Sequence, residues 1–302
     1  MISLICRKEY MLQQLEESFP QTVISESFSQ TDAEVLIADP SELTKKNLSS
    51  LTNLKLVISS RAGFDAADTD WMKQQKIIFC NSRGLYSQPI AEFIVERILA
   101  FSTNSLQYYQ QQLKHQYQTI SQRELLSELT IGFLGTGSIA QYAASLLAVF
   151  HPNVIGYKRT HVSELKNFDN IFYPGQLKEF LGKSDIVVVT VDLNQSTYHI
   201  LGEKEFCWMK NGATLINVAR GSIINEHSLI ESLRNGKLAY AALDVFEDEP
   251  LPISSPLWNM NNVLITPHAS GICSSNHMLF TKMVIDDIRR WEKGIQLVNR
   301  VF

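Results

Sequence analysis

Three side chains in the second half of the chain have types and positions suited to hydride-transfer chemistry. Arg220 follows the run ATLINVA, Glu249 lies just beyond YAALDVF, and His268 follows NVLITP. An arginine can bind a carboxylate and polarise a carbonyl, and a histidine can give a proton to a developing alkoxide. A neighbouring carboxylate such as Glu249 would favour the imidazolium and orient the ring. This set would support the interconversion of a 2-oxo acid and a 2-hydroxy acid.

Each of these residues also has a simple structural explanation. Arg220 could form a surface ion pair, Glu249 could precede Pro250 in a turn, and His268 could be a satisfied structural histidine. All three follow apolar runs of strand type, however, and the carboxyl ends of parallel strands meet at one edge of a sheet. Their order behind a nucleotide-binding turn therefore favours a catalytic set.

That turn, of the G-x-G-x-x-A type, joins the run LTIGFL to the helical run QYAASLLAVF. Gly135 would permit a tight turn, Gly137 would let the backbone approach a pyrophosphate, and Ala140 would allow close helix packing. The N–H groups at the start of the helix would face the anion. An ordinary strand-to-helix turn is the alternative, but the flanking strand and helix favour a dinucleotide site. The predicted cofactor-binding residues of the turn are Gly135, Thr136, Gly137, Ser138 and Ile139.

The next run, NVIGYKRTH, ends in basic residues. An aspartate or glutamate at this position would accept hydrogen bonds from the adenosine ribose and select NAD. Lys158 and Arg159 can instead neutralise a 2′-phosphate, and Thr160 can donate a hydrogen bond to it. A solvated basic loop is the simpler alternative. We predict NADP(H) as the preferred cofactor, with NAD(H) possible.

A second anion contact is predicted near the start of the chain. The run LKLVISS leads into Arg61-Ala62-Gly63-Phe64-Asp65, a turn whose backbone N–H groups could cradle the substrate's carboxylate. Gly63 would make close approach possible. A plain strand-to-helix turn capped by Asp65 is an equal alternative on local grounds. We therefore place Ala62 and Gly63 with Arg220 as candidate substrate-binding residues.

The elements that must position these side chains form two series of short apolar runs, separated by polar or helical stretches. A Gln-rich segment between the two series is predicted to be irregular, and a helix over 274–293 should return to the first domain. The predicted fold class is α/β, with two Rossmann-like doubly wound parallel-sheet domains and a cleft between them. Residues 1–98 and 273–302 should form a discontinuous, flavodoxin-like substrate or lid domain. Residues 99–272 should form a nucleotide-binding Rossmann domain that includes a linker helix.

Composition narrows the classes of partner. The chain has 302 residues, of which 45% are apolar, and a formal net charge of -4. This balance gives no electrostatic reason to expect nucleic acid or an anionic membrane as partner. No apolar run reaches the length of a membrane span or a secretory core, so we expect a soluble cytoplasmic protein. The cysteines are widely separated and no histidine–carboxylate cluster has metal spacing, so no metal is predicted.

At this point the chain resembles the D-isomer-specific 2-hydroxyacid dehydrogenases over nearly its whole length. The matching stretches are SRAGFDAAD, NSRGLYSQPIAEFIVERILAF, IGFLGTGSIA, MKNGATLINVARGSIINEHSLIESL, AALDVFEDEPLP and NVLITPHASG. The resemblance implies that Arg220 binds the substrate's carboxylate and oxo group, that His268 is the acid/base and that Glu249 pairs with it. It also implies a lid domain built from both chain ends and, usually, a homodimer.

Further roles follow from the same resemblance. Asp244 is similar to the residue beside the nicotinamide carboxamide, Ala219 would also contact the cofactor, and Ala62 with Gly63 matches the substrate cradle. Two departures from the pattern concern the cofactor. Ala140 stands in place of the third glycine, and Lys158-Arg159-Thr160 replaces the acidic ending, which argues for NADPH.

The function expected from the sequence is hydride transfer between NADP(H) and a small 2-oxo or D-2-hydroxy acid, in the direction of reduction. Formate dehydrogenases share the arginine and histidine but resemble a version with glutamine at Glu249, so they are disfavoured. A non-catalytic or weakly catalytic NAD(P)-sensing protein of the same fold is the alternative from another class. Glyoxylate, hydroxypyruvate and longer 2-oxo acids all remain open as substrates.

Overall fold

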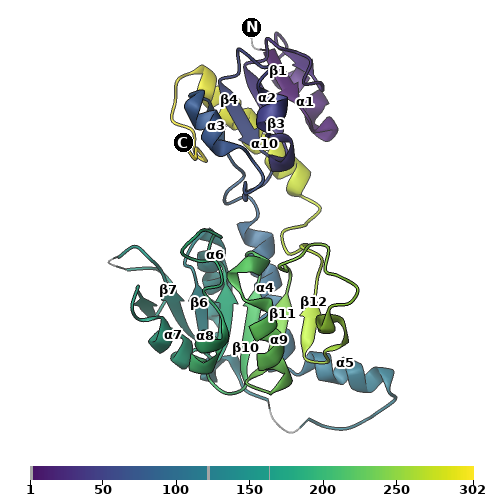
Figure 1. The fold of residues 1–302 in the computed structure, drawn as a ribbon, viewed down its shortest axis with the longest axis vertical. Helices are drawn as coiled ribbons and strands as arrows, with labels where there is room; N and C mark the ends of the chain where they lie inside the picture. The colour runs from purple at the N-terminus through teal and green to yellow at the C-terminus, as the bar shows by residue number, and fades with distance from the viewer. Residues whose placement is uncertain (1–2, 121–122, 163) are drawn as a thin grey trace. The chain divides into compact units, whose positions relative to one another are not determined.

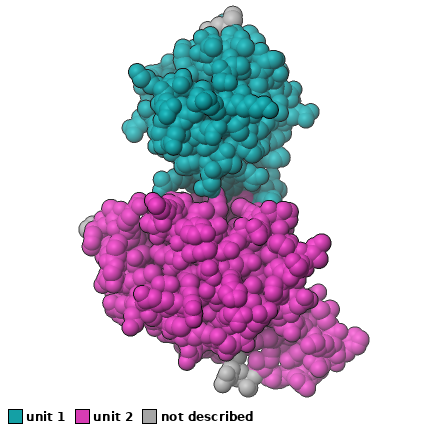
Figure 2. Space-filling model, in the orientation of Figure 1, with its two compact units in different colours: residues 1–86, 272–302 teal, residues 87–271 magenta. Residues whose placement is uncertain are grey.

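The computed structural model describes residues 3–120, 123–162 and 164–302. The chain divides into two compact units, unit 1 with residues 1–86 and 272–302, and unit 2 with residues 87–271 (Figure 2). The first boundary differs from the one predicted after residue 98. Helix α4 (Ser87–Ser102) is continuous and packs against α6 (Ser138–Leu147), so all of it belongs to unit 2.

Unit 1 is built on a parallel sheet with the strand order β2-β1-β3-β4-β5 (Figure 1). Its strands are β1 (Ser3–Cys6), β2 (Val23–Ser25), β3 (Val35–Ala38), β4 (Leu56–Ser59) and β5 (Ile78–Cys80). Its helices are α1 (Leu12–Ser18), α2 (Lys45–Leu48), α3 (Thr69–Gln74) and α10 (Asn276–Glu292), with short 3-10 turns η1 (Glu9–Met11) and η2 (Pro40–Glu42). This order is the flavodoxin-like form of the doubly wound fold.

Both faces of the unit 1 sheet are covered. On one face, Met11 and Leu15 from the N-terminal helices meet Phe280 and Val284 of α10. Met72 of α3 packs with residues of the opposite face in a separate cluster. The return of α10 to this sheet was expected from the periodicity of the last helix, and it makes unit 1 discontinuous in sequence.

Unit 2 is built on a parallel sheet with the order β12-β11-β10-β9-β6-β7-β8. Its strands are β6 (Thr130–Leu134), β7 (Asn153–Tyr157), β8 (Asn170–Phe172), β9 (Ile186–Val189), β10 (Ala213–Asn217), β11 (Leu238–Leu243) and β12 (Val263–Ile265). Besides α4 and α6, its helices are α5 (Ser105–Leu113), α7 (Leu177–Lys183), α8 (Glu203–Trp208) and α9 (Glu226–Arg234). Its 3-10 turns are η3 (Leu126–Glu128), η4 (Ala148–Phe150), η5 (Gly221–Ile223) and η6 (Pro256–Asn259). This is the Rossmann order, with the switch point between β6 and β9.

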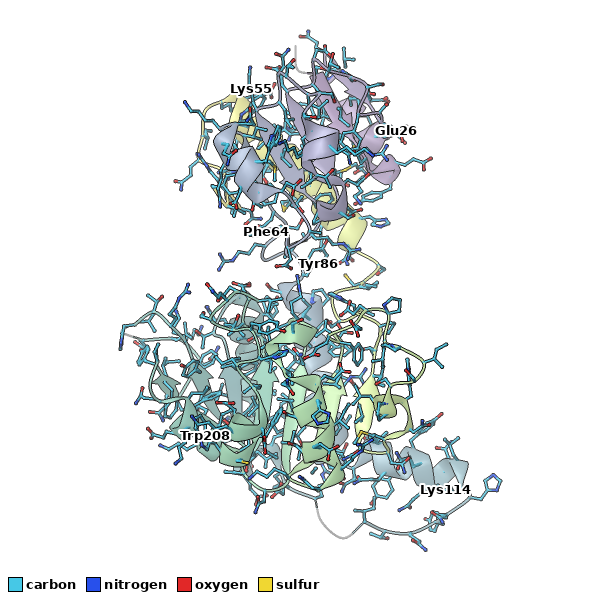
Figure 3. The ribbon with its side chains drawn as sticks, in the orientation of Figure 1. Glu26, Lys55, Phe64, Tyr86, Lys114 and Trp208 are labelled. Carbon is cyan, nitrogen blue, oxygen red and sulfur yellow. The ribbon has the colours of Figure 1, made fainter. Side chains whose placement is uncertain are left out.

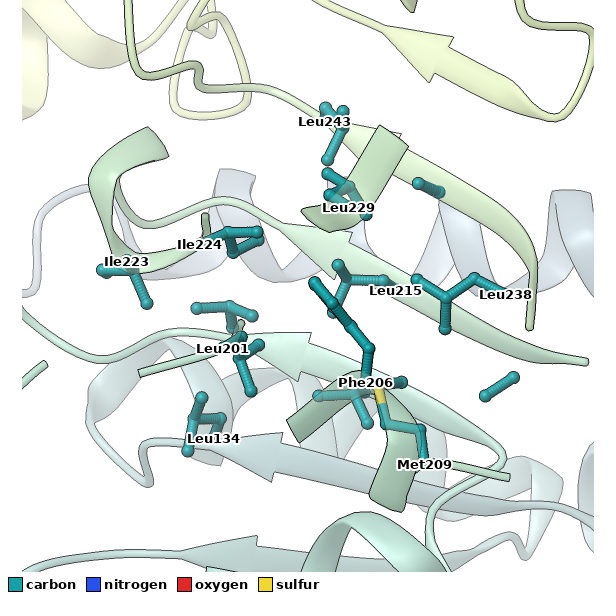
Figure 4. Packing of buried hydrophobic residues seen from close by; sticks show 14 of the residues in the cluster. Leu134, Leu201, Phe206, Met209, Leu215, Ile223, Ile224, Leu229, Leu238 and Leu243 are labelled. Atoms are coloured by element: carbon teal, nitrogen blue, oxygen red, sulfur yellow. The ribbon is translucent and has the colours of Figure 1, made fainter. Parts of the chain in front are cut away.

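Alternation along the strands of unit 2 creates two cores. In β9, Ile186 and Val188 face the core shared with α4 and α6, whereas Val187 and Val189 face the opposite core. That second core contains Phe206 of α8 and Leu229 of α9 packed against the sheet (Figure 4). Because both faces of β9 are buried, its sequence is continuously apolar. The predicted α/β class with two parallel sheets is confirmed, while the cleft between the domains stays a prediction.

The Gln-rich segment was predicted to be irregular, and this was wrong for its first part. Ser105–Leu113 forms helix α5, which begins after Asn104 in a left-handed conformation (φ 56°). None of the helix is fully buried, which explains why its sequence lacks an apolar stripe. Across the described residues, no helix combines the length and apolarity needed to cross a membrane.

Candidate active site

The glycine-rich turn lies between β6 and α6, at the switch point of the unit 2 sheet. Gly135 has φ 101°, and a Cβ there would come within 2.8 Å of the Val191 nitrogen. Its N–H donates to the Tyr157 carbonyl over 2.9 Å. A side chain at this position would therefore be both strained and blocked. Gly135 therefore lets the chain turn from β6 toward α6 in close contact with Thr190 and Val191, which follow β9.

Two features of the turn fit a bound dinucleotide. A Cβ added at Gly137, the N-cap of α6, would meet nothing within 4 Å, so the backbone there is open to approach. The Thr136 side chain is buried, at 5% exposure, and its Oγ1 has no hydrogen-bond partner among the described residues. Buried hydroxyls normally find a partner. The open N-cap and the unpaired Thr136 hydroxyl lie at the helix start where a pyrophosphate would accept hydrogen bonds.

The other turn residues take ordinary positions. Ser138 is exposed and accepts a hydrogen bond from the Ser87 hydroxyl over 2.8 Å, whereas Ile139 is half-buried and packs at the edge of the α4–α6 core. Ala140 is fully buried in that core. A larger residue at Ala140 would therefore push α6 away from its neighbours, which is the packing role predicted for this position.

The basic stretch after β7 forms an exposed loop. The Lys158 N–H donates to the Phe172 carbonyl over 2.9 Å, while Arg159 and Thr160 are exposed. The ring of His161 stacks on Tyr173 at 3.8 Å. The Tyr173 hydroxyl also donates to the carbonyl of Val162, the residue after His161, over 3.2 Å. Sequence reasoning gave His161 no role, yet its stack fixes one end of the basic loop.

Arg220 stands in a turn that is held by a buried asparagine. The Asn217 side chain, at 1% exposure, accepts from the Ala219 N–H (3.1 Å) and donates to the Arg220 carbonyl (3.1 Å). The Arg220 guanidinium donates to the Ala219 carbonyl over 2.7 Å and is half-buried. Asn217 thus sets the direction in which the chain leaves β10. The sequence analysis missed it because it lies within the strand run itself.

Glu249 and His268 are in direct contact. His268 Nδ1 lies 2.8 Å from Glu249 Oε2, with the side chains 49% and 37% exposed respectively. The other carboxylate oxygen of Glu249 accepts from the Phe246 N–H over 3.1 Å. Because Nδ1 faces the carboxylate, the remaining ring nitrogen, Nε2, is the one that can meet a substrate. The carboxylate on Nδ1 therefore fixes the ring's orientation.

The loop that carries His268 is folded around Asp244. This carboxylate is fully buried and accepts hydrogen bonds from the Thr266 hydroxyl (2.6 Å), the Ala269 N–H (2.8 Å) and the Ser270 N–H (2.9 Å). The His268 N–H donates to the Asp244 carbonyl over 2.8 Å. These bonds hold His268 in a left-handed conformation, φ 53°, that is unusual for a residue with a side chain. Asp244 was predicted as a cofactor contact, and its observed contacts show that it also shapes the histidine loop.

In unit 1, the predicted cradle follows β4. The carbonyl oxygens of Ser60 and Ala62 accept from the Tyr86 hydroxyl and the Asn81 side chain, both over 2.7 Å. Figure 3 shows Tyr86 and Phe64 at the same end of this unit. With these carbonyls turned inward, the N–H groups of Ala62 and Gly63 have no acceptor within the described parts of the chain. This is the backbone arrangement that an anion-binding turn requires.

Comparison with known proteins identifies the family. The sequence model for "D-isomer specific 2-hydroxyacid dehydrogenase, NAD binding domain" matches residues 95–270, more than half of the chain. The chain belongs to this family. The recognition made from the motifs is therefore confirmed, and unit 2 contains the NAD-binding domain of a D-2-hydroxyacid dehydrogenase.

Relatives with more specific names support the same membership. A glyoxylate reductase from Aeropyrum pernix is 29% identical over 265 residues, which cover 84% of this chain and 78% of that protein. A dehydrogenase of the family from Xanthobacter autotrophicus Py2, solved with NADPH and MES, is 28% identical with a TM-score of 0.86, covering 99% of this chain and 98% of its own. An NADPH-dependent glyoxylate/hydroxypyruvate reductase from Sinorhizobium meliloti, solved with NADP and sulfate, is 25% identical with a TM-score of 0.82, covering 100% and 98%.

Membership makes this chain an NAD(P)-dependent oxidoreductase of the D-2-hydroxyacid dehydrogenase type. Within unit 2, the glycine turn follows β6, Arg220 follows β10, Asp244 and Glu249 follow β11, and His268 follows β12. These strand ends lie along one edge because all the strands are parallel. The roles of the individual residues remain predictions. Within the described residues, no group of three or more histidine, cysteine or acidic side chains is arranged to hold a metal ion.

Proposed function

We propose that this D-2-hydroxyacid dehydrogenase reduces a small 2-oxo acid to the 2-hydroxy acid, with NADPH as the preferred hydride source. The observation that carries the proposal is the 2.8 Å contact between Glu249 and His268 in the same unit as the open nucleotide turn. A histidine held on a carboxylate at the carboxyl edge of a dinucleotide-binding sheet is suited to protonate an alkoxide.

The cofactor would be held by the turn and by the basic loop. Gly137 and the first N–H groups of α6 would approach the pyrophosphate, and Thr136 Oγ1 would gain the partner that it lacks. Lys158 and Arg159 would neutralise a 2′-phosphate. When bound, the cofactor supplies the hydride. This preference is supported by the basic loop and by the relatives from Xanthobacter autotrophicus Py2 and Sinorhizobium meliloti, which were solved with NADPH and NADP respectively.

The chain's own residues would carry the remaining steps of the reaction. Arg220 would bind the substrate's carboxylate and polarise its oxo group. The turn with Ala62 and Gly63 in unit 1 stays a separate proposal as a carboxylate-binding turn. His268 would hold a proton on Nε2 and release it to the oxygen as negative charge develops there. Glu249 would stabilise the imidazolium through Nδ1 and keep Nε2 directed at the substrate.

The test is initial-rate oxidation of NADPH and NADH, in parallel, against glyoxylate, hydroxypyruvate, pyruvate and longer 2-oxo acids. His268→Ala is the matched variant, for which we expect a loss of roughly two to four orders of magnitude in rate with NADPH binding retained. Preferred NADPH turnover by the wild type, with an inactive variant, supports the proposal. Unchanged turnover in the variant would remove His268 from the mechanism, and preference for NADH would remove the phosphate role of the basic loop.

We also propose a homodimer and a cytoplasmic location. Support for the dimer comes from α5, where Tyr109 and Leu113 are 56% and 64% exposed, a degree of apolar exposure that a partner could cover. Light scattering at micromolar concentration tests the dimer, and a monomer mass would contradict it. Cell fractionation tests the location.

A further inference from the structure

Outside the Glu249–His268 pair, unit 2 contains a second cluster of titratable side chains, formed by His199, Glu226 and Glu247. The backbone N–H of Glu226 donates to Glu247 Oε1 over 3.1 Å, and the backbone N–H of Glu247 donates to Glu226 Oε2 over 3.3 Å. Each glutamate thus accepts from the main chain of the other. This reciprocal pair ties the start of α9 to the loop after β11.

His199 joins the pair from a third segment. Its Nε2 lies 2.7 Å from Glu247 Oε1, although without the alignment of a hydrogen bond. Its backbone N–H donates to the Ser222 carbonyl over 2.9 Å. Asn225, the N-cap of α9, approaches Nδ1 of the same ring at 3.5 Å. The cluster therefore joins the 197–201 turn to the segment 220–226, which begins with Arg220.

These contacts bear directly on the candidate catalytic residues. Glu247 is two positions before Glu249, and Phe246 donates its N–H to the Glu249 carboxylate. On the other side, Gly221 follows Arg220, and a Cβ at Gly221 would come within 1.9 Å of the Phe246 carbonyl oxygen. The turn after Arg220 and the loop before Glu249 therefore pack backbone against backbone at Gly221 and Phe246. They are also joined by the hydrogen bonds between Glu226 and Glu247.

We propose that Glu226, Glu247 and His199 form a positioning clamp, which sets the location of Arg220 relative to the Glu249–His268 pair. None of the three is assigned to contact substrate or cofactor. The two carboxylates lie together with Asp248 nearby, and partial burial raises the pKa of Glu226, with Glu247 and Asp248 adding to the effect. His199 lies against these carboxylates, with its Nε2 2.7 Å from Glu247 Oε1.

The effect of the clamp on the reaction rate rests on the proposed function. Proton transfer and carbonyl polarisation must act on the same oxygen, so Arg220 and His268 need a fixed separation. A displacement of about 1 Å can reduce a rate roughly 100-fold. The segments that carry Arg220 and Glu249 touch at Gly221 and Phe246, and the clamp adds hydrogen bonds on one side of this single contact.

The test compares Glu247→Ala and Glu226→Ala with the wild type, with Glu231→Ala as control. Glu231 lies on the same helix, α9, but is exposed and pairs with Arg234. Hydrogen–deuterium exchange followed by mass spectrometry reports on the clamp without requiring turnover. We expect the amides of 246–249 and 266–270 to exchange at least roughly tenfold faster in both clamp variants, with other segments unchanged.

Catalysis gives the second readout. With the best 2-oxo acid of the panel, we expect kcat to fall roughly 10- to 100-fold in each clamp variant while the Kd for NADPH stays within about twofold. The double variant should be little worse than either single one, because one clamp is lost in each case. Glu247→Gln, which keeps the acceptor oxygen, should restore most of kcat.

The possible results distinguish a failure of the clamp proposal from a failure of the proposed function. Unchanged exchange at 246–249 would overturn the clamp, and faster exchange with an unchanged kcat would overturn its positioning role. Faster exchange throughout unit 2 would mean a general structural role, and would also overturn it. A wild type that reduces no 2-oxo acid would contradict the proposed function, while the exchange result would still decide whether the clamp exists.

Discussion

At the carboxyl edge of the unit 1 sheet, the side chains around Asp39 satisfy one another, whereas at the same edge of unit 2 a buried hydroxyl has no partner among the described residues. In unit 1, Asp39 accepts from Lys8 and Ser60, and Arg61 approaches it to 3.8 Å. In unit 2, Thr136 Oγ1 is buried without a partner in the described chain, and Gly137 faces open space. Two sheets of the same class thus have edges of different character.

The difference distinguishes the turn after β6, which has capacity to bind a ligand, from the cluster around Asp39, which has little. Paired charges such as those around Asp39 stabilise the fold locally and leave little capacity for a further group. An unpaired buried hydroxyl beside an exposed helix N-terminus is unfavourable in the isolated protein and favourable once an anion binds. On this comparison, substitutions at the unit 2 turn should change binding and rate, and substitutions among paired or buried charges of unit 1 should chiefly change stability.

The largest effect should come from Arg220. We expect Arg220→Met to lower kcat/KM for the 2-oxo acid by roughly 100- to 1000-fold, because the variant can neither bind the carboxylate nor polarise the carbonyl. Steady-state kinetics with NADPH measures it. Arg234→Met is the control, since Arg234 is exposed on α9 and pairs only locally with Glu231. A loss smaller than about threefold would show that the arginine turn is structural.

A smaller effect should come from the basic loop. Lys158→Asp combined with Arg159→Ala should weaken NADPH binding about 100-fold and NADH binding far less, because repulsion replaces neutralisation of the 2′-phosphate. Fluorescence titration of both cofactors measures the ratio. Lys178→Asp, an exposed lysine on α7, makes one of the same charge changes away from the loop. Equal weakening of both cofactors would make the loop a general electrostatic feature.

The smallest effect should appear in unit 1 and concern stability alone. Burial raises the pKa of Asp287 on α10 to about 6 from 3.8, with Asp286 adding to the shift. Since the folded pKa is raised, the folded state favours the protonated acid, and stability falls as pH rises from about 4 through 6. Asp287→Asn removes this ionisation. It should therefore stabilise the protein by about 1–3 kcal/mol at pH 8 and by much less at pH 4.

Urea unfolding of the wild type and Asp287→Asn at both pH values measures the difference. The side chain is only 1% exposed and its Oδ2 has no partner among the described residues, so solvent does not relieve the charge. Glu292→Gln is the control, because it removes an exposed carboxylate at the end of the same helix. A difference between wild type and Asp287→Asn that is independent of pH would rule out ionisation as its cause.

Sequence patterns predicted the interior strands and the apolar edge strand β12, which lies within NVLITP, but missed two other edge strands. The run Val35–Ala38 coincides with β3, because a strand buried on both faces is apolar throughout. The edge strands β2 and β8, each of three residues, were not predicted, since partly exposed edges tolerate polar residues. Helix α5 was missed for a related reason: none of its side chains is fully buried, so its sequence has no apolar stripe.

The candidate site divides in a similar way. Arg220, Glu249 and His268 could be selected because their side chains have distinctive chemistry and follow recognisable strands. Asn217 could not be selected, because it acts through hydrogen bonds to backbone groups, which any local pattern of residues can offer. Asp244 was selected as a cofactor contact, but its hydrogen bonds to the histidine loop were not predicted. The partnership of Glu226 and Glu247 joins two residues of the same charge, which no pairing rule based on side-chain type would suggest.

Gly221 gives a way to judge related sequences and redesigned versions of this one. A chain could keep the arginine, the glutamate and the histidine and still carry a side chain at the position of Gly221. Its Cβ would then overlap the Phe246 carbonyl group, and the two loops would separate. Such a chain would pass a search for the three reactive residues and still lack their arrangement. The glycine next to Arg220 is therefore as informative a marker of an intact site as the reactive residues themselves.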